Sequence, residues 1–121
     1  MYYARYVLTV RHVQSREQFQ KLQGALMEQE LIDYVFDFGH FYQDDEEAVF
    51  DPVAFQIWID SNERLSLLSV LFPDMVFELW VMKEDGEQWK NYYQNGKIEF
   101  CPGIVKFEKP SLIQWKQYEK F

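Results

Sequence analysis

The sequence predicts a single α+β domain in which an antiparallel sheet carries two helices on one face. Three observations lead to this prediction. Tyr, Val, Ile and Phe alternate with polar residues in several separate segments, which is typical of half-buried strands. Two other segments space their apolar residues three and four apart, which is typical of amphipathic helices. The chain has 121 residues, of which 48% are hydrophobic and only nine are Gly or Pro, so it can form one core of its own.

The N-terminal part predicts a strand followed by a helix. Residues 2–13 are rich in Tyr, Val and Thr, and their period-two pattern puts alternate side chains on opposite faces. Ser15 is followed three residues later by Gln18, a capping-box spacing in which each side chain can accept a hydrogen bond from a free backbone N–H group. The helix that begins there is expected to run to about Glu30.

The middle of the chain predicts a hairpin. In residues 31–42 apolar side chains alternate with carboxylates, which predicts a half-buried strand with its acids on the wet face. Residues 44–47 are four consecutive carboxylates and predict a solvated turn. A second strand is expected within residues 48–60, starting at Val53, because Pro52 cannot donate a ladder hydrogen bond and is confined to an edge or a strand start.

The C-terminal half predicts a short helix and a three-stranded meander. Ser61 or Asn62 is expected to cap the helix, and Pro73 to end it. Asp85-Gly86 is a strong turn dipeptide, and Asn95-Gly96 supplies the positive φ angles of a type I′ turn. The strands are expected at residues 75–83, 88–94 and 98–108, with a bend near Pro102-Gly103, and a short terminal helix is expected from Ser111 through Tyr118.

This order of elements is that of a ferredoxin-like βαββαβ sandwich with a C-terminal β-hairpin extension. Two helices would cover one face of the antiparallel sheet. The other face is expected to be free, and it is where such a domain usually meets a partner or a second copy of itself. Residues 1–121 contain no linker or internal repeat, so we expect one domain.

Charge is concentrated in the middle third of the chain. The 42 residues from 22 to 63 hold eleven of the twenty carboxylates and neither a Lys nor an Arg, whereas the remaining residues hold nine carboxylates and all twelve basic side chains. The formal net charge of −8 is therefore a difference between −11 in this segment and +3 elsewhere. Such a field attracts basic partners and repels nucleic acid and anionic lipid, so we expect no direct nucleic-acid or membrane binding.

The compartment is expected to be the cytoplasm. Cys101 is the single cysteine and cannot form an internal disulfide. The first residues lack the apolar run of a signal peptide, and no stretch approaches the roughly 18 to 20 apolar residues of a membrane-spanning helix.

Three motifs follow one another in the C-terminal half: the Phe-Pro at residues 72–73 with the strand after it, Glu84-Asp85-Gly86 with Trp89, and Tyr92-Tyr93-Gln94-Asn95-Gly96. Together they resemble the C-terminal half of the Api-type ferredoxin-like proteins of phages and plasmids. The resemblance covers about a quarter of the chain, and the Trp-Cys pair expected in the first strand of that family is missing. The resemblance implies a mobile-element origin and no known enzymatic activity.

The sequence offers little for catalysis or metal binding. A calcium loop needs oxygen ligands at alternating positions and a Gly at the sharp turn, which residues 44–47 do not provide. His12, His40 and Cys101 are too few for a structural zinc site. A reactive Cys101 would need a histidine beside it, and a buried inert thiol is the more common outcome. We therefore expect neither an enzyme nor a cofactor.

Two functions remain open. The first is an inhibitor or immunity protein of anti-CRISPR or anti-nuclease type, a nucleic-acid mimic of phage or mobile-element origin that occupies the basic surface of a nuclease or CRISPR effector. The second is a ferredoxin-like module, either a structural homodimer or a small-ligand binder. For the first function, aromatic anchors would join acidic contacts, because Trp and Tyr are common interface hot spots. The candidate contact residues are Asp33, Asp37, Asp44, Asp45, Glu46, Glu47, Asp51, Trp89 and Tyr92.

Overall fold

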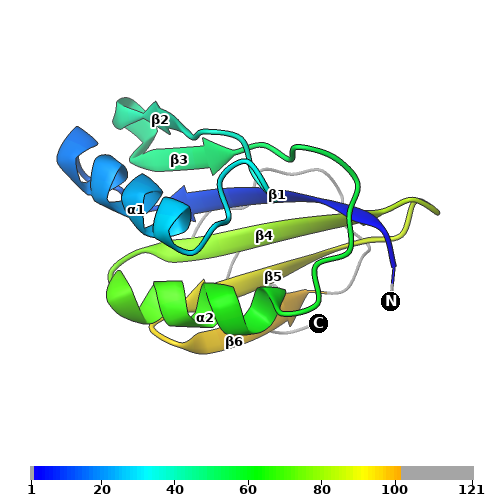
Figure 1. Cartoon of the computed structure of the whole chain (residues 1–121). Helices are drawn as coiled ribbons and strands as arrows, with labels where there is room; N and C mark the ends of the chain where they lie inside the picture. Colours follow the sequence, from blue (N-terminus) through cyan, green and yellow to red (C-terminus); the bar gives the residue numbers. More distant parts are fainter. Residues whose placement is uncertain (1, 102–121) are drawn as a thin grey trace.

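A six-stranded antiparallel sheet with two helices makes up residues 2–101, which are the residues that the computed structural model describes (Figure 1). The elements are β1 Ala4–Arg11, α1 Arg16–Glu28, β2 His40–Tyr42, β3 Glu47–Phe50, α2 Ser61–Leu71, β4 Val76–Lys83, β5 Gln88–Gln94 and β6 Lys97–Cys101. The strand order is β2-β3-β1-β4-β5-β6. A short 3-10 turn, Gln43–Asp45, joins β2 to β3.

Helix α1 begins at the capping box that its sequence predicts. The Ser15 hydroxyl oxygen accepts a hydrogen bond from the Gln18 N–H at 3.1 Å. Gln18 Oε1 accepts a hydrogen bond from the N–H of Gln14 at 2.8 Å, one residue before Ser15, whose N–H is the expected donor in a capping box. Two of the N–H groups at this helix start are thereby satisfied, which fixes where the helix begins.

The strand predicted for residues 31–42 is wrong for most of its length. Only residues 40–42 pair with β3. Before them the N–H groups of Val35 and Phe36 both bond the carbonyl of Leu31 at 3.0 Å, and Asp33 has a φ of 72°. Because a residue with positive φ interrupts an extended chain, the segment turns on itself and buries adjacent residues in pairs instead of alternate ones.

The next strand is displaced toward the N-terminus. It was expected to start at Val53, whereas β3 spans Glu47–Phe50 and ends before Pro52. Pro52 has no N–H group to continue the ladder, so here it marks the exit from the strand and not its start. Residues 51–60 then run as an irregular extended segment across the end of the sheet (Figure 1).

Most elements of the C-terminal half lie where they are predicted. Helix α2 begins at Ser61 and ends before Pro73, but the predicted cap is wrong: Asp60, and neither Ser61 nor Asn62, takes the N-cap position, and it makes no side-chain cap bond. Asn95 and Gly96 have φ angles of 48° and 80°, as a type I′ turn requires. Strand β6 runs to Cys101, and the predicted bend at Pro102-Gly103 and the terminal helix from Ser111 lie outside the described residues.

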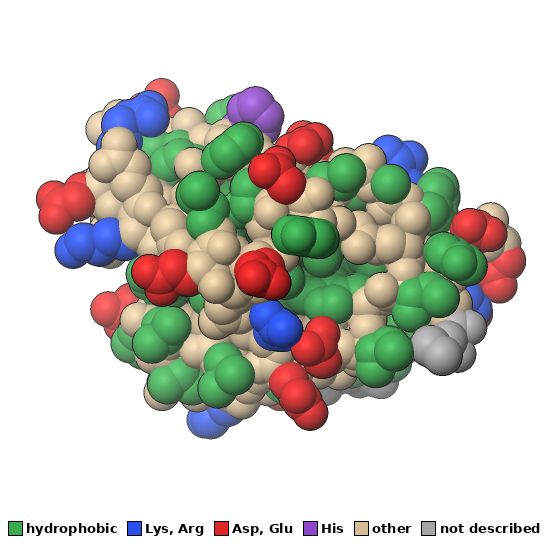
Figure 2. Space-filling model, in the orientation of Figure 1, with side chains coloured by type: hydrophobic (Ala, Val, Ile, Leu, Met, Phe, Trp, Pro, Cys, Tyr) green, Lys and Arg blue, Asp and Glu red, His purple; other side chains and the backbone are tan. Residues whose placement is uncertain are grey.

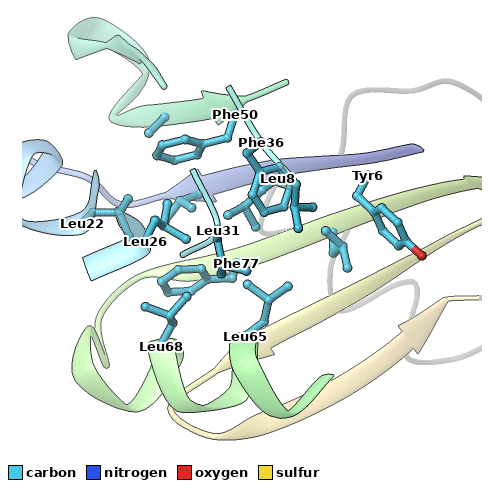
Figure 3. Packing of buried hydrophobic residues seen from close by; sticks show 14 of the residues in the cluster. Tyr6, Leu8, Leu22, Leu26, Leu31, Phe36, Phe50, Leu65, Leu68 and Phe77 are labelled. Carbon is cyan, nitrogen blue, oxygen red and sulfur yellow. The ribbon is translucent and has the colours of Figure 1, made fainter. Parts of the chain in front are cut away.

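Both helices pack on the same face of the sheet and share one core with it (Figures 1 and 3). Leu22 and Leu26 enter this core from α1, and Leu65 and Leu68 enter it from α2. The sheet contributes side chains that alternate along β1, β3 and β4, among them Leu8, Phe50 and Phe77. Burial of these apolar surfaces is the main stabilising contribution to the fold.

Two glycines give opposite predictions for substitution by alanine. A Cβ atom at Gly24, inside α1, would meet nothing within 4 Å, whereas one at Gly39 would overlap the ring of Phe50. We expect Gly24→Ala to raise the free energy of unfolding by about 0.5–1 kcal/mol through helix propensity. We expect Gly39→Ala to lower it by about 1–3 kcal/mol, because the buried ring must move. Urea unfolding of both variants checks this pair, and equal effects of the same sign would contradict it.

Candidate functional site

Three of the predicted acidic contacts gather at the turn of the β2-β3 hairpin. Asp44 and Asp45 lie in the 3-10 turn, and Glu46 follows with a left-handed φ of 50°. All three side chains are exposed. The structure thus places the solvated turn where the sequence predicts it.

Glu47 does not belong to that exposed group. It is the first residue of β3 and sits directly across from Arg11 of β1. Its carboxylate lies 3.8 Å from the Arg11 guanidinium, and both side chains are only about an eighth exposed. Glu47 is therefore engaged within the protein, and the predicted acidic run ends at Glu46.

The other predicted acids lie on loops, not on a sheet face. Asp33 and Asp37 belong to residues 31–39, and Asp51 directly follows β3. The N–H of Asp37 donates to the carbonyl of Asp51 at 2.9 Å, which holds these two acidic residues side by side. The expectation that they line one face of the sheet is wrong, because the segment that carries them is not a strand.

The predicted aromatic anchors are less exposed than the sequence suggests. Tyr92 is only 2% exposed, so it is not an anchor at the surface. Trp89 is half-buried and meets the ring of Tyr2 edge-on at 5.4 Å. Exposed aromatic side chains are found elsewhere, among them Tyr34 and Phe38 in the loop of residues 31–39 and Phe55 in the loop of residues 51–60.

Charged residues are buried on the sheet face that lacks the helices. Arg11 of β1 donates to Glu78 of β4 at 3.1 Å, and the Lys90 ammonium of β5 lies 3.7 Å from the other oxygen of Glu78. The side chains of Glu78 and Lys90 are 6% and 8% exposed. Burial lowers the pKa of Lys90, and the Glu78 carboxylate opposes that shift. These charges compensate one another, as buried ions must.

This face was expected to be a free surface, and for its central strands that expectation is wrong. Val76, Tyr92 and Cys101 form a second buried cluster beside the charged group. Period two puts Arg11 and Glu78 on the face of their own strands opposite the core residues, but the strand order and register bring them together with Lys90.

A cavity of about 460 Å³ lies between the first turn of α2 and strands β4 to β6. Aromatic side chains of Tyr2, Trp89 and Phe100 line it together with the polar side chains of Ser61, Asn62 and Asn91. The volume is within the range of small-ligand pockets.

A hydrogen-bond cluster adjoins this cavity. Asn62 Oδ1 accepts hydrogen bonds from the Tyr93 hydroxyl at 2.6 Å and from Asn91 Nδ2 at 3.4 Å. Burial raises the pKa of Tyr93 above its usual range. Asn91 Oδ1 is buried and has no hydrogen-bond partner among the described residues. A buried acceptor without a partner is uncommon and points to a ligand or water that donates to it.

His40 and Cys101 do not form a pair. His40 lies in β2 and Cys101 in β6, which are opposite edges of the sheet. Within residues 2–101, no three His, Cys, Asp or Glu side chains gather where they could hold a metal ion. Neither α1 nor α2 is long and apolar enough to cross a bilayer.

Comparison of the chain with protein-family models, with curated proteins and with solved structures finds no match.

Proposed function

We propose that this protein is a non-enzymatic acidic binding protein that occupies the basic surface of a protein partner. The observation that carries the proposal is the segregation of charge. Exposed carboxylates cluster at the hairpin turn and on the adjoining loops, and residues 22–63 contain no Lys or Arg to neutralise them. Such a surface favours Lys- and Arg-rich partners and accelerates association with them at low salt.

The partner class that fits best is a protein with a phosphate-binding surface, such as a nuclease or CRISPR effector. Lys and Arg side chains that bind phosphates also bind carboxylates through the same charge-assisted hydrogen bonds. An acidic protein can therefore compete with nucleic acid for that surface. The strand order β2-β3-β1-β4 supports a ferredoxin-like fold. The resemblance to Api-type ferredoxin-like proteins is the only support for a mobile-element origin.

The first test is capture of partners from a host lysate at low and high salt, followed by affinity measurements with the recovered protein. We expect recovery of a nucleic-acid-binding protein at low salt and its loss at high salt, because exposed charges are screened. Capture of only neutral or acidic proteins, or binding that is insensitive to salt, would contradict the proposal.

Charge reversal at the hairpin turn should weaken binding to the recovered partner by at least tenfold. The variant is Asp44→Lys, Asp45→Lys and Glu46→Lys, and it leaves Glu47 in place because Glu47 pairs with Arg11. The matched control reverses Glu28, Asp74 and Glu84, which are exposed, lie in other parts of the chain and form no ion pair within residues 2–101, and it changes the net charge by the same amount. Equal losses in the two triple variants would show a general charge effect and exclude a specific role of the β2-β3 turn.

A second candidate function is a small-ligand-binding module. The cavity beside α2 and the unpartnered Asn91 Oδ1 favour it. A ligand with a flat apolar body and a hydrogen-bond donor fits the aromatic walls and the buried acceptor. In ligand screening by NMR, shifts confined to Asn62, Asn91 and Trp89 would support this function, and the absence of shifts there across a broad set of such compounds would exclude it. The homodimer remains a proposal that sedimentation tests directly.

A further inference from the structure

We propose that the surface formed by residues 31–39 and 51–60 is the docking site for an amphipathic, basic segment of the protein partner. This paired-loop surface combines exposed apolar side chains with carboxylates. The inference rests on the proposed function and adds to it where the partner binds and which chemistry it presents.

Backbone hydrogen bonds join the two loops into one layer. Asp37 N–H donates to Asp51 O at 2.9 Å, and Val53 N–H donates to Val35 O at 3.1 Å. Gln56 adds a side-chain bond from its Nε2 to the carbonyl of Tyr34 at 2.7 Å. Its backbone also exchanges two hydrogen bonds with Ala4, at 3.0 and 2.9 Å, which attaches the layer to the end of β1. A surface held this way is preorganised for binding.

From residue 55 to residue 59 of the segment 51–60, exposed apolar side chains alternate with half-buried ones. Trp58 turns inward and packs edge-on against Tyr6 and Phe36, with ring centroids 5.3 and 5.6 Å apart. The exposed side chains include Ile59 at 77% and, from the other loop, Tyr34 at 68%. Figure 2 shows hydrophobic side chains over this segment with carboxylates among them. The full exposed set is Tyr34, Phe38, Val53, Phe55, Ile57 and Ile59.

This arrangement is not required by the fold. Exposed single apolar residues are ordinary, but six large ones on two adjoining loops are typical of an interaction surface. In an extended segment, alternate side chains point to opposite faces, and only one face packs against the protein. In this segment Gln56 and Trp58 are the half-buried side chains on that inward face. The outward face is therefore available for a partner.

Charge decides the kind of partner. Asp33, Asp37 and Asp51 are exposed on the same two loops, and none of them forms an ion pair within residues 2–101. Two cations contact these loops: the Arg64 guanidinium pairs with Asp60 at 3.0 Å, and that of Arg5 lies 5.5 Å from the ring of Phe55. Carboxylates therefore outnumber cations on this surface. A second copy of the chain would bring these carboxylates against one another, and anionic lipid or nucleic acid would be repelled. A segment with an apolar face and flanking Lys or Arg matches both the exposed apolar side chains and the carboxylates of the paired-loop surface. Amphipathic helices are recognised through such a combination of apolar and charged contacts.

The test uses synthetic helical peptides as probes and NMR titration of the full chain at low salt. The probe is an amphipathic leucine-lysine peptide, with a glutamine-lysine peptide and a leucine-glutamate peptide of equal length as controls. We expect the leucine-lysine peptide to shift the amide signals of residues 31–39 and 51–60. Binding should weaken at least tenfold in the double variant Tyr34→Ser, Ile59→Ser.

A matched double variant separates this surface from general hydrophobicity. Leu67 and Leu71 on α2 are 62% and 63% exposed, so Leu67→Ser with Leu71→Ser removes similar apolar area elsewhere. We expect binding of the leucine-lysine peptide to be unchanged in that variant. Shifts centred on α2, or equal weakening in both double variants, would overturn the inference.

The peptide controls separate failure of this inference from failure of the proposed function. If the glutamine-lysine peptide binds as tightly as the leucine-lysine peptide, the apolar side chains are not used and the inference fails, while binding of basic partners stands. If neither lysine peptide binds at low salt, the proposed function fails as well. A dimer in sedimentation that Tyr34→Ser with Ile59→Ser dissociates would assign the surface to a second copy and overturn the inference.

Discussion

Replacing Glu78 by Gln is expected to lower the free energy of unfolding by about 3–5 kcal/mol, which is the range for removal of one partner from a buried ion pair. Glu78 is the shared anion between Arg11, at 3.1 Å, and Lys90, at 3.7 Å. Gln keeps the size of the side chain and can still accept a hydrogen bond, but it leaves two cations in a buried site with less compensation. Urea unfolding at neutral pH measures the loss.

Two further variants test the cause of this loss. Glu84→Gln removes an exposed carboxylate just after β4 and is expected to change stability by no more than about 0.5 kcal/mol. The double variant Glu78→Gln, Lys90→Met removes the buried anion and one cation together, and Arg11 keeps Glu47 as its partner. We expect it to be more stable than Glu78→Gln alone. A double variant that is less stable than the single one would show that the buried Lys90 ammonium does not destabilise the protein when Glu78 is absent.

Phe36→Ala is expected to lower the free energy of unfolding by about 3–5 kcal/mol, as for other buried Phe to Ala substitutions. Phe36 is fully buried, and its ring lies 5.6 Å from that of Trp58 and 6.5 Å from that of Phe50. It is the largest of the side chains through which loop 31–39 enters the core, the others being Leu31, Ile32 and Val35 (Figure 3). The cavity left by Ala therefore removes packing from both loops of the paired-loop surface. Urea unfolding gives the loss of stability, and limited proteolysis should show faster cleavage within residues 31–39 and 51–60.

The control for this variant lies two residues further along the same loop. Phe38 is 52% exposed, so Phe38→Ala removes an aromatic ring without opening a core cavity. We expect a change of no more than about 0.5–1 kcal/mol and unchanged proteolysis. If the two variants lose equal stability, the burial of Phe36 in the core does not stabilise loop 31–39.

Local signals in the sequence determined the order of elements and most of their ends. The capping box at Ser15, the stop at Pro73 and the turn at Asn95-Gly96 act within a few residues, so they can be recognised without knowledge of the rest of the chain. The charge asymmetry is likewise a property of the sequence. It predicts the exposed acids at the β2-β3 turn, and it is the basis of the proposed preference for a basic partner.

Only the tertiary structure decided what residues 31–39 and 51–60 become. Their alternating apolar residues predict strands, but Asp33 takes a left-handed φ and Pro52 ends the ladder, so both segments leave the sheet and bond to each other. The same holds for Arg11, Glu78 and Lys90, which lie far apart in the sequence and meet because β1, β4 and β5 are neighbours. Local patterns report which face of a segment is apolar, whereas strand order and long-range contacts determine whether that face is buried. For this reason the charge of the proposed binding surface follows from the sequence, whereas the position of its exposed apolar side chains follows from the fold.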